Sequence, residues 1–441
     1  PMRSFGVVIV FLALAVPAYW FAQLAPNRDV EALFSQYLGV TALVAMGLSQ
    51  LMATRLAFLE PVFGGLDRIY VLHKWLGVGA IVAILLHDTI DAEMEALGRQ
   101  TGLMEFAETL GEISLYGILI LGVLTIATWV PYQFWRLTHK FMGAFFVLSA
   151  LHFIFIGKPF DLGDPLAVYV LAFCAVGTLS YLYTLVPFGV LQGKAAYEVA
   201  EVETTGDTVA ISLKPLRGGI SHKAGQFAFV SFVVPGKSEV HPFTISAAPN
   251  ADKTIRFTAK GLGDYTRSLG EIAVGTRARV SRAYGHFQPA KRGSCDVWIG
   301  AGIGITPFLA WSGRGDPVPR PTHLFYCVQS AANAVGLGEL EAAAAADPQL
   351  TLHVVDSSVS GRLTADVISD AIGGVGKGVN AHFCGPKPMR KALKDGLVAK
   401  GLRRSAFHYE EFEIRSDLGL RKASGWLMER SVRRFRKTAS S

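Results

Sequence analysis

Charged side chains and cysteines are scarce in this sequence. Charged residues make up 17% of the 441 positions, whereas hydrophobic residues make up 51%. The four cysteines are Cys174, Cys295, Cys327 and Cys384. None lies in a segment that we expect outside the cell, so no disulfide framework is implied. The sequence also has no Asn-X-Ser/Thr sequon and no calcium-binding loop motif.

Charged residues are scarcest in the first 190 residues, which contain apolar runs of about 20 residues. Such a run, as a helix, crosses about 30 Å of hydrocarbon. The first run is too long for a signal peptide and lacks a small-residue cleavage site after it. We predict six transmembrane helices, near residues 5–24, 37–59, 70–90, 111–131, 137–157 and 165–190.

The distribution of basic residues predicts the orientation of these helices. Arg55, Arg68, Lys74, Arg136 and Lys140 fall in one set of connections, whereas the opposite set is rich in acidic residues. The positive-inside rule then places both termini in the cytoplasm, with the chain in the plasma or inner membrane. Residues 413–441 carry eight basic and three acidic side chains. This tail either contacts anionic lipid or is simply solvated.

Two of the predicted spans each contain two histidines. The segment "LHKWLGVGAIVAILLHD" holds His73 and His87, and "THKFMGAFFVLSALHF" holds His139 and His152. At 1.5 Å per residue, the two spacings correspond to about 21 Å and about 20 Å along a helix. His73 can therefore face His139 near the cytoplasm, and His87 can face His152 near the outside. Two haems with paired histidine ligands fit this pattern.

The two spacings differ in rotation and leave alternatives open. Fourteen helical steps return to within about 40° of the starting face, but thirteen steps end about 140° away. The second helix is therefore bent, bulged or tilted, or its two haems approach from different sides. Zinc would require three or four ligands, which neither depth offers. A proton-coupled transporter remains the alternative for this half, because membrane histidines also form proton relays.

The histidine arrangement resembles that of the ferric reductase and NADPH oxidase superfamily. Phe145 matches the aromatic residue that lies between the haems of that family. The resemblance implies a membrane all-α six-helix bundle that binds two b-type haems. It also implies a cytosolic ferredoxin-reductase-like module, with an antiparallel β-barrel FAD domain and an α/β Rossmann-like nucleotide domain.

The segment after residue 190 contains short alternating strands and three stretches that resemble the flavin motifs of this superfamily. These are "HPFTISAAP" at 241–249, "GDYTRSL" at 263–269 and "RAYGHF" at 282–287. The resemblance places Thr244 near the reactive edge of the FAD ring and Gly263 and Thr266 at its pyrophosphate. The remaining implied flavin contacts are His241, Pro242, Phe243 and Ser246.

From residue 295 the pattern becomes alternating strand and helix. "CDVWIGAGIGITPFLAW" joins an apolar strand to a glycine-rich turn and a helix that opens at Thr306 and Pro307. Glycine permits a tight turn and a close approach to a pyrophosphate, which the helix N-terminus would stabilise. The glycines of this turn are Gly300, Gly302 and Gly304.

Three further stretches match the nucleotide domain of the superfamily. In "SGRL" the resemblance implies that Arg362 meets the 2′-phosphate of NADPH. "AHFCGPKPM" brings Cys384, with Gly385 and Pro386, beside the nicotinamide during hydride transfer. "FHYEEF" contains Phe412, the candidate aromatic over the flavin, with Tyr409 in reserve.

Together these features predict four parts: a bis-haem membrane domain (1–192), an FAD barrel (193–290), an NADPH domain (291–412) and a basic tail (413–441). The implied function is electron transfer from cytosolic NADPH through FAD and two b-type haems to an outer acceptor. Dioxygen, giving superoxide, is the first candidate acceptor, and a ferric or cupric chelate or a quinone is the alternative. A partner-dependent electron-supply subunit is a different class of function. We expect a bacterial protein with no nucleic-acid partner and no obligatory protein partner.

Overall fold

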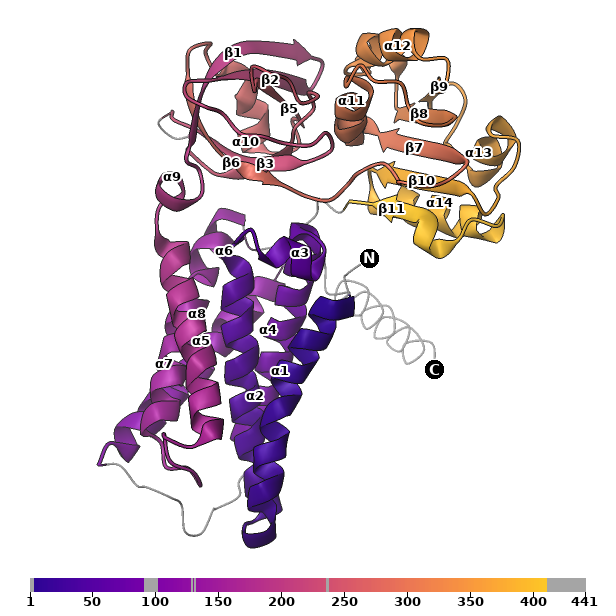
Figure 1. Cartoon of the computed structure of the whole chain (residues 1–441). Coiled ribbons are helices and arrows are strands. Elements are labelled where there is room, and N and C mark those ends of the chain that lie inside the picture. Colours follow the sequence, from indigo (N-terminus) through magenta and orange to yellow (C-terminus); the bar gives the residue numbers. More distant parts are fainter. Residues whose placement is uncertain (1–3, 91–101, 128–129, 131, 235–237, 411–441) are drawn as a thin grey trace, which may run out of the picture. The chain divides into compact units, whose positions relative to one another are not determined.

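The computed structural model describes residues 4–90, 102–127, 130, 132–234 and 238–410. They form two compact units that divide after Leu185, and each unit is described by itself (Figure 1). Phe412 and the basic tail 413–441 lie outside the described residues.

The first unit is a bundle of long apolar helices. Within the described residues, six helical segments are long and apolar enough to cross a membrane, as predicted. The fifth is interrupted, and a short helix, α3 (Leu59–Phe63), joins the second segment to the third. The segments are α1 (Ser4–Leu24), α2 (Val30–Ala53), α4 (Leu66–Thr89), α5 (Met104–Ile126), α6 with α7 (Tyr132–His139 and Met142–Phe155) and α8 (Pro165–Leu185).

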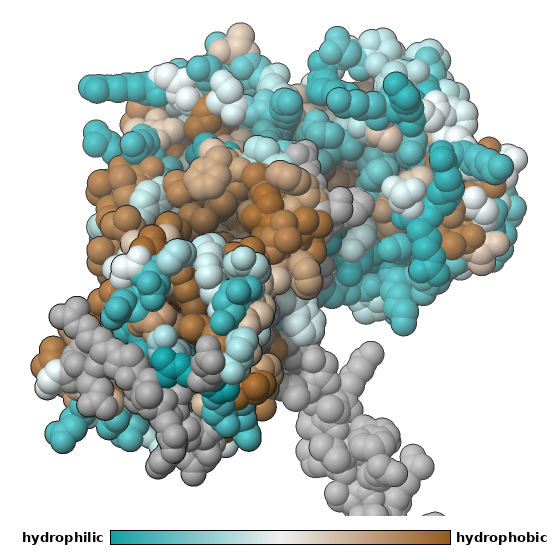
Figure 2. Space-filling model, turned by 60° about the horizontal axis from the view of Figure 1, so that its bottom comes forward, coloured by the Kyte–Doolittle hydropathy of each residue, from teal (hydrophilic) through white to brown (hydrophobic). Residues whose placement is uncertain are grey.

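The sides of this bundle are apolar. Figure 2 shows hydrophobic residues gathered along the helices and hydrophilic residues at the end of the bundle that faces the viewer. Large exposed side chains include Phe11 on α1, Ile120 and Val123 on α5 and Leu179 on α8. An exposed apolar surface of this kind is the expected lining of a lipid-facing helix bundle.

Several helix boundaries differ from the predicted ones, and at two of them the local sequence, rather than hydropathy, sets the helix end. Helix α2 begins at Val30 instead of residue 37, since the Asp29 carboxylate accepts a hydrogen bond from the Ala32 N–H at 2.8 Å. Helix α5 begins at Met104 rather than 111. Helix α8 ends at Leu185, just before a Val186–Pro187 pair that disfavours helical backbone.

The fifth segment is overwound between its two histidines. Residues 140 and 141 leave the helix, and three hydrogen bonds of the i to i−3 type join Leu137 to Gly143. Such turns rotate about 120° per residue instead of about 100°. Four of these steps lie between His139 and His152 and add about 80°, which brings His152 from about 140° to within about 60° of the face that carries His139. The break therefore corrects more than half of the rotational mismatch that the thirteen-residue spacing predicted.

The second unit begins with the short helix α9 (Phe188–Leu191) and an antiparallel barrel whose strand order is β4-β3-β6-β1-β2-β5. A bridge between Ile245 and Phe257 closes it beyond β4. Its core contains Tyr197, Leu213 and Phe232, all essentially buried. The strands are β1 (Ala195–Thr205), β2 (Thr208–Pro215), β3 (Phe227–Phe232), β4 (His241–Thr244), β5 (Ile255–Lys260) and β6 (Arg277–Tyr284).

A parallel sheet follows, in the order β11-β10-β7-β8-β9. Helices α11 and α12 pack on one face, and α13 and α14 pack on the other. The strand order reverses between β7 and β10, where open α/β sheets bind ligands. The elements are β7 (Cys295–Ala301), α11 (Thr306–Ser312), β8 (Thr322–Val328), α12 (Leu337–Ala346), β9 (Leu350–Asp356), α13 (Ala365–Ala371), β10 (Val379–Cys384), α14 (Lys387–Ala399) and β11 (Phe407–Tyr409). The predicted fold class, a membrane helix bundle with a barrel and an α/β module, is confirmed.

Candidate functional site

The helical unit brings the predicted histidine pairs together. The ring centroids of His73 on α4 and His139 on α6 lie 6.1 Å apart. Two imidazoles bound on opposite sides of one metal, each with its nitrogen about 2 Å away, have centroids about 6 Å apart. His87 and His152 lie at the other end of the same two segments, on α4 and α7. The first pair therefore has room for one metal atom between its rings.

Helix α2 fixes the two histidines of α4. Nδ1 of His73 lies 2.9 Å from the carbonyl oxygen of Ser49 and 2.8 Å from its hydroxyl. Nδ1 of His87 lies 2.9 Å from both the carbonyl oxygen and the hydroxyl of Ser35. A carbonyl oxygen can only accept, so Nδ1 carries the proton in both rings. The lone pair is therefore on Nε2 and available to a metal.

Helix α5 supplies the hydrogen-bond acceptors for the two histidines of the α6–α7 segment. Nδ1 of His152 donates to the carbonyl oxygen of Ala107 at 2.7 Å. Nδ1 of His139 lies 3.1 Å from the hydroxyl of Thr125, and that hydroxyl donates to the carbonyl oxygen of Leu121 at 2.7 Å. The hydroxyl proton is thus engaged, and the Thr125 oxygen accepts from His139. All four imidazoles therefore share one protonation pattern.

Glycines make room for these rings. A Cβ at Gly39 on α2 would lie 3.3 Å from the His87 ring, and one at Gly111 on α5 would lie 2.8 Å from Nδ1 of His152. A Cβ at Gly117 would overlap the ring of Phe145, so that aromatic side chain packs directly on α5. Phe145 lies on α7 between the positions of His139 and His152.

The donor set fits haem rather than a bare metal ion. Among the residues that the structure describes, no three His, Cys, Asp or Glu side chains converge as a metal-ion site. A zinc ion would need that third ligand. Two neutral imidazoles with Nδ1 bonded to the protein match the axial ligation of a b-type haem, because second-shell acceptors orient such ligands.

In the barrel, two of the predicted flavin motifs meet. The ring of His241 on β4 stacks on Tyr265 of the 263–269 turn, with centroids 3.9 Å apart. Nε2 of His241 also lies 2.9 Å from a carboxylate oxygen of Glu239. Along the strand, Pro242 is exposed, Phe243 is half-buried and Thr244 is buried.

In the 263–269 turn, Thr266 and Gly263 bond each other. The Gly263 N–H donates to the Thr266 hydroxyl at 3.0 Å, and that hydroxyl lies 3.1 Å from the Gly263 carbonyl oxygen. A Cβ at Gly263 would meet no atom within 4 Å. The turn is therefore open to a ligand on that side.

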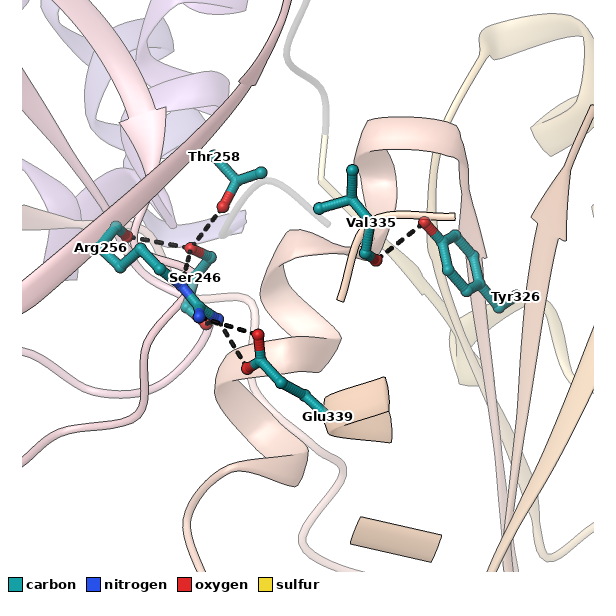
Figure 3. Close-up of polar contacts among 6 residues, drawn as sticks. All are labelled: Ser246, Arg256, Thr258, Tyr326, Val335 and Glu339. Carbon is teal, nitrogen blue, oxygen red and sulfur yellow. Dashed lines mark hydrogen bonds and ion pairs between the residues drawn. The ribbon is translucent and has the colours of Figure 1, made fainter. Parts of the chain in front are cut away.

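Ser246 is the buried end of a network that connects the barrel to the α/β domain and is exposed at its other end, Glu339. Its hydroxyl lies 2.8 Å from that of Thr258 and 3.3 Å from Nε of Arg256 (Figure 3). The Arg256 guanidinium also donates two hydrogen bonds of 2.8 Å to the Glu339 carboxylate on α12. Nearby, Tyr326 donates to the carbonyl oxygen of Val335 at 3.1 Å. Ser246 thus anchors a link between the two domains of the unit.

At the strand-order reversal, the glycine-rich turn after β7 meets the end of β10. Gly300 pairs with Cys384 across the two strands. A Cβ at Gly304 would overlap the carbonyl of Cys384, whereas Gly302 has a φ of +55° and open space around it. Gly385 follows half-buried, and Pro386 is exposed. The predicted nucleotide motifs therefore converge at one point.

Two residues of this motif point into the protein instead. Thr306 and Pro307 are buried in α11. The Thr306 hydroxyl donates to the carbonyl oxygen of Ile303 at 3.1 Å. Their side chains support the turn rather than line an open surface.

Cys384 is fully buried, and its thiol is kept neutral. Burial raises the pKa of Cys384 well above its usual value, and the nearby Glu410 carboxylate raises it further. The Glu410 side chain reaches the barrel, since a Cβ at Gly285 would lie 3.0 Å from its carboxylate oxygen. A protonated thiol therefore occupies the end of β10 at neutral pH.

The other two predicted positions differ in their surroundings. Arg362 is exposed in the loop after β9, at the carboxyl edge of the parallel sheet. Tyr409 packs among α14 side chains, with the Arg390 guanidinium 4.2 Å from its ring centroid. It belongs to the cluster on the sheet face opposite that of Cys384. Tyr409, the second candidate for the aromatic residue over the flavin, thus lies on the sheet face away from Cys384.

The sequence interpretation missed the residues that hold the histidines. Ser35 and Ser49 are fourteen residues apart, the same spacing as His73 and His87, and this shared period was a usable signal. The carbonyl of Ala107 gives no signal, because any residue supplies a carbonyl.

Comparisons with known proteins agree with this arrangement. Residues 38–150 match the family described as "Ferric reductase like transmembrane component", and residues 194–286 match "FAD-binding domain". The first match includes His73, His87 and His139 and ends two residues before His152. The chain thus carries the domain pair of a flavin oxidoreductase of the ferric reductase or NADPH oxidase type.

Individual relatives are distant. Dual oxidase 2 of Rattus norvegicus is 24% identical over 373 residues, which cover 70% of this chain and 23% of that protein. The flavohemoprotein of Rhizobium meliloti (strain 1021) is 24% identical over 50% of this chain and 60% of its own length. The flavohemoglobin structure from Malassezia yamatoensis, with bound FAD and heme, has a TM-score of 0.47 and 15% identity. That alignment covers 86% of this chain and 96% of the other.

Proposed function

We propose that this protein transfers electrons from NADPH through FAD and two b-type haems across a membrane. The observation that carries the proposal is the shared protonation of four histidines, whose Nδ1 atoms are bound to α2 and α5. Each leaves Nε2 for a metal. His73 and His139 would hold one haem, and His87 and His152 would hold the other. A proton relay has no need for four rings with the same tautomer.

The soluble unit supports the other end of the pathway. When bound, FAD accepts a hydride from NADPH and releases electrons singly to haem. The exposed edge of β4 at Pro242 and the open turn at Gly263 would hold the flavin. The turn at Gly302 would accept the nucleotide pyrophosphate, and the neutral thiol of Cys384 would pack near the nicotinamide without adding charge. We place both termini and this unit in the cytoplasm, from the basic connections.

The proposal is tested on the purified full-length protein supplied with haem and FAD. We expect a haem b Soret band, stoichiometric FAD and anaerobic reduction of both by NADPH. Colourless protein that binds no haem would overturn the proposal in favour of a transporter. Rapid flavin reduction with haem reduction only after addition of another protein would indicate a partner-dependent subunit.

We propose dioxygen as the terminal acceptor, in the balanced reaction NADPH + 2 O₂ → NADP⁺ + H⁺ + 2 O₂⁻. The support is that the match to a protein named dual oxidase spans 70% of this chain. His87 and His152 would both be used as ligands of the outer haem, which would supply electrons to oxygen without a protein group that binds oxygen directly. A ferric chelate is the second candidate, favoured by the family description of residues 38–150.

Cytochrome c reduction driven by NADPH separates these acceptors. If oxygen is the acceptor, superoxide dismutase abolishes most of the signal, and removal of oxygen does the same. A signal insensitive to dismutase, together with faster anaerobic reduction of ferric chelate, would contradict the oxygen proposal and leave the electron-transfer pathway intact.

Replacement of Arg362 tests the choice of nucleotide. Arg362→Ala removes a cation that would pair with the 2′-phosphate, an interaction typically contributing about 1.5–3 kcal/mol. We expect KM for NADPH to rise about 10- to 100-fold, since each 1.4 kcal/mol is tenfold, with little change for NADH. Arg404→Ala, an exposed arginine before β11 at the opposite edge of the sheet, is the control. Equal effects on both nucleotides would exclude phosphate recognition by Arg362.

A further inference from the structure

The four imidazole N–H groups do not have equivalent acceptors. His73, His87 and His152 each donate to a backbone carbonyl oxygen, from Ser49, Ser35 and Ala107 respectively. No side-chain substitution removes a carbonyl. His139 differs from these three: among the described residues, its Nδ1 has the Thr125 side-chain hydroxyl as its acceptor, at 3.1 Å.

We propose that Thr125 is a positioning residue that sets the reduction potential of the haem held by His73 and His139. The inference rests on the proposed function, because it assigns haem to that pair. An acceptor on the distal N–H makes an imidazole more basic, and a more basic ligand stabilises ferric over ferrous iron. Thr125 therefore lowers the potential of this haem through His139.

The geometry of α5 prepares Thr125 for this role. Its hydroxyl donates to the carbonyl oxygen of Leu121, one turn earlier, at 2.7 Å. That bond fixes the hydroxyl rotor and leaves the oxygen lone pairs for His139. Ala107 and Thr125 are eighteen residues apart, about five helical turns, so both acceptors lie on one face of α5. The same helix face thus serves both histidines of the α6–α7 segment.

His139 has little else to hold its orientation. The ring stacks on Trp135, one turn earlier on α6, with centroids 5.4 Å apart and planes 27° apart. Stacking restricts tilt but supplies no acceptor for the N–H. His139 is the last residue of α6 and lies inside the overwound turn from Leu137 to Gly143, so it is not held in a regular helix as a mid-helix ligand is. The Thr125 bond therefore supplies both orientation and electron density.

The experiment is a spectroelectrochemical titration of the full-length protein loaded with haem. Thr125→Val keeps the shape of the side chain and removes the acceptor. We expect one haem component to shift upward by about 59 mV, equivalent to a tenfold change in its ratio of oxidised to reduced forms at fixed potential. The reduction potential of the other haem component should not change. Thr125→Ser, which restores the hydroxyl, should restore the potential.

Two further variants keep the outcome decisive. Ser49→Ala removes the hydroxyl beside Nδ1 of His73, the other histidine of this pair, but leaves the Ser49 carbonyl oxygen that accepts from it. The shift in reduction potential should therefore be much smaller than in Thr125→Val. Thr125→Cys, with a weak sulfur acceptor, should shift the potential upward if the valine variant fails to fold. No shift in Thr125→Val, or in Thr125→Cys if the valine variant fails to fold, would overturn the inference, and so would an equal shift in Ser49→Ala. Wild-type protein that binds no haem would instead overturn the proposed function.

Discussion

His87→Ala is expected to leave the protein with one haem instead of two. The ring of His87 is the only imidazole that α4 offers at that depth, since His73 lies fourteen residues away, about 21 Å along the helix. Without it, His152 would be a single ligand in an apolar bundle and could not replace the lost bond. Flavin reduction by NADPH should continue at the wild-type rate, because that reaction belongs to the other unit.

The measurement is the ratio of haem to FAD, from the pyridine haemochrome and from released flavin. Ser35→Ala is the matched control, since it removes the hydroxyl beside His87 but keeps the carbonyl that accepts from Nδ1 at 2.9 Å. That variant should keep two haems. An unchanged haem ratio in His87→Ala, or an equal loss in Ser35→Ala, would refute the assigned pairing.

Gly304→Ala is expected to lower the rate of flavin reduction by NADPH at least 100-fold. The added methyl group would overlap the carbonyl of Cys384 and the following peptide bond. Backbone cannot move aside as a flexible side chain can, so the turn after β7 and the end of β10 must separate. Misplacement of reacting groups by about 1 Å can cost about 100-fold in rate.

Two other glycines provide graded controls for this variant. Gly338→Ala, on α12 of the same domain, meets open space without a positive φ and should be close to wild type. Gly302→Ala also meets open space but has a φ of +55°, which costs about 1–2 kcal/mol for a residue with a side chain. Stopped-flow bleaching of the flavin gives the rate, and retained FAD with normal dithionite reduction shows that the barrel is folded. A wild-type rate in Gly304→Ala would contradict the assigned nucleotide site.

Hydropathy and histidine spacing predicted which helices form the membrane half and that His73 lies beside His139. They could not predict the boundary at Val30, which depends on one carboxylate cap at Asp29. They also left open how a thirteen-residue spacing brings His139 and His152 toward the same side of the segment. The answer is a set of backbone hydrogen bonds, and the amino-acid types of these residues give little indication that such bonds form.

The soluble half shows a similar division. The motifs assigned Gly300 and Cys384 to the same nucleotide, and the structure pairs the two residues, because parallel strands bring their carboxyl ends to one edge. It did not predict that Thr306 and Pro307 face inward. A seven-residue helix buried on most sides gives no amphipathic pattern from which to tell its faces. Tyr409 was likewise assigned by motif, while its packing against Arg390 depends on where α14 lies.

The overwound turn between α6 and α7 also changes length. A tight turn rises about 2.0 Å per residue rather than about 1.5 Å, so the four steps that follow His139 gain about 2 Å. The thirteen residues from His139 to His152 then span about 22 Å, beside about 21 Å for the fourteen residues of α4. The turn therefore substitutes for a missing amino acid, in both reach and rotation. A single residue inserted after Lys140 would let this segment relax into a regular helix that keeps its ligands in step with α4, whereas the same insertion between His73 and His87 would put that helix out of step.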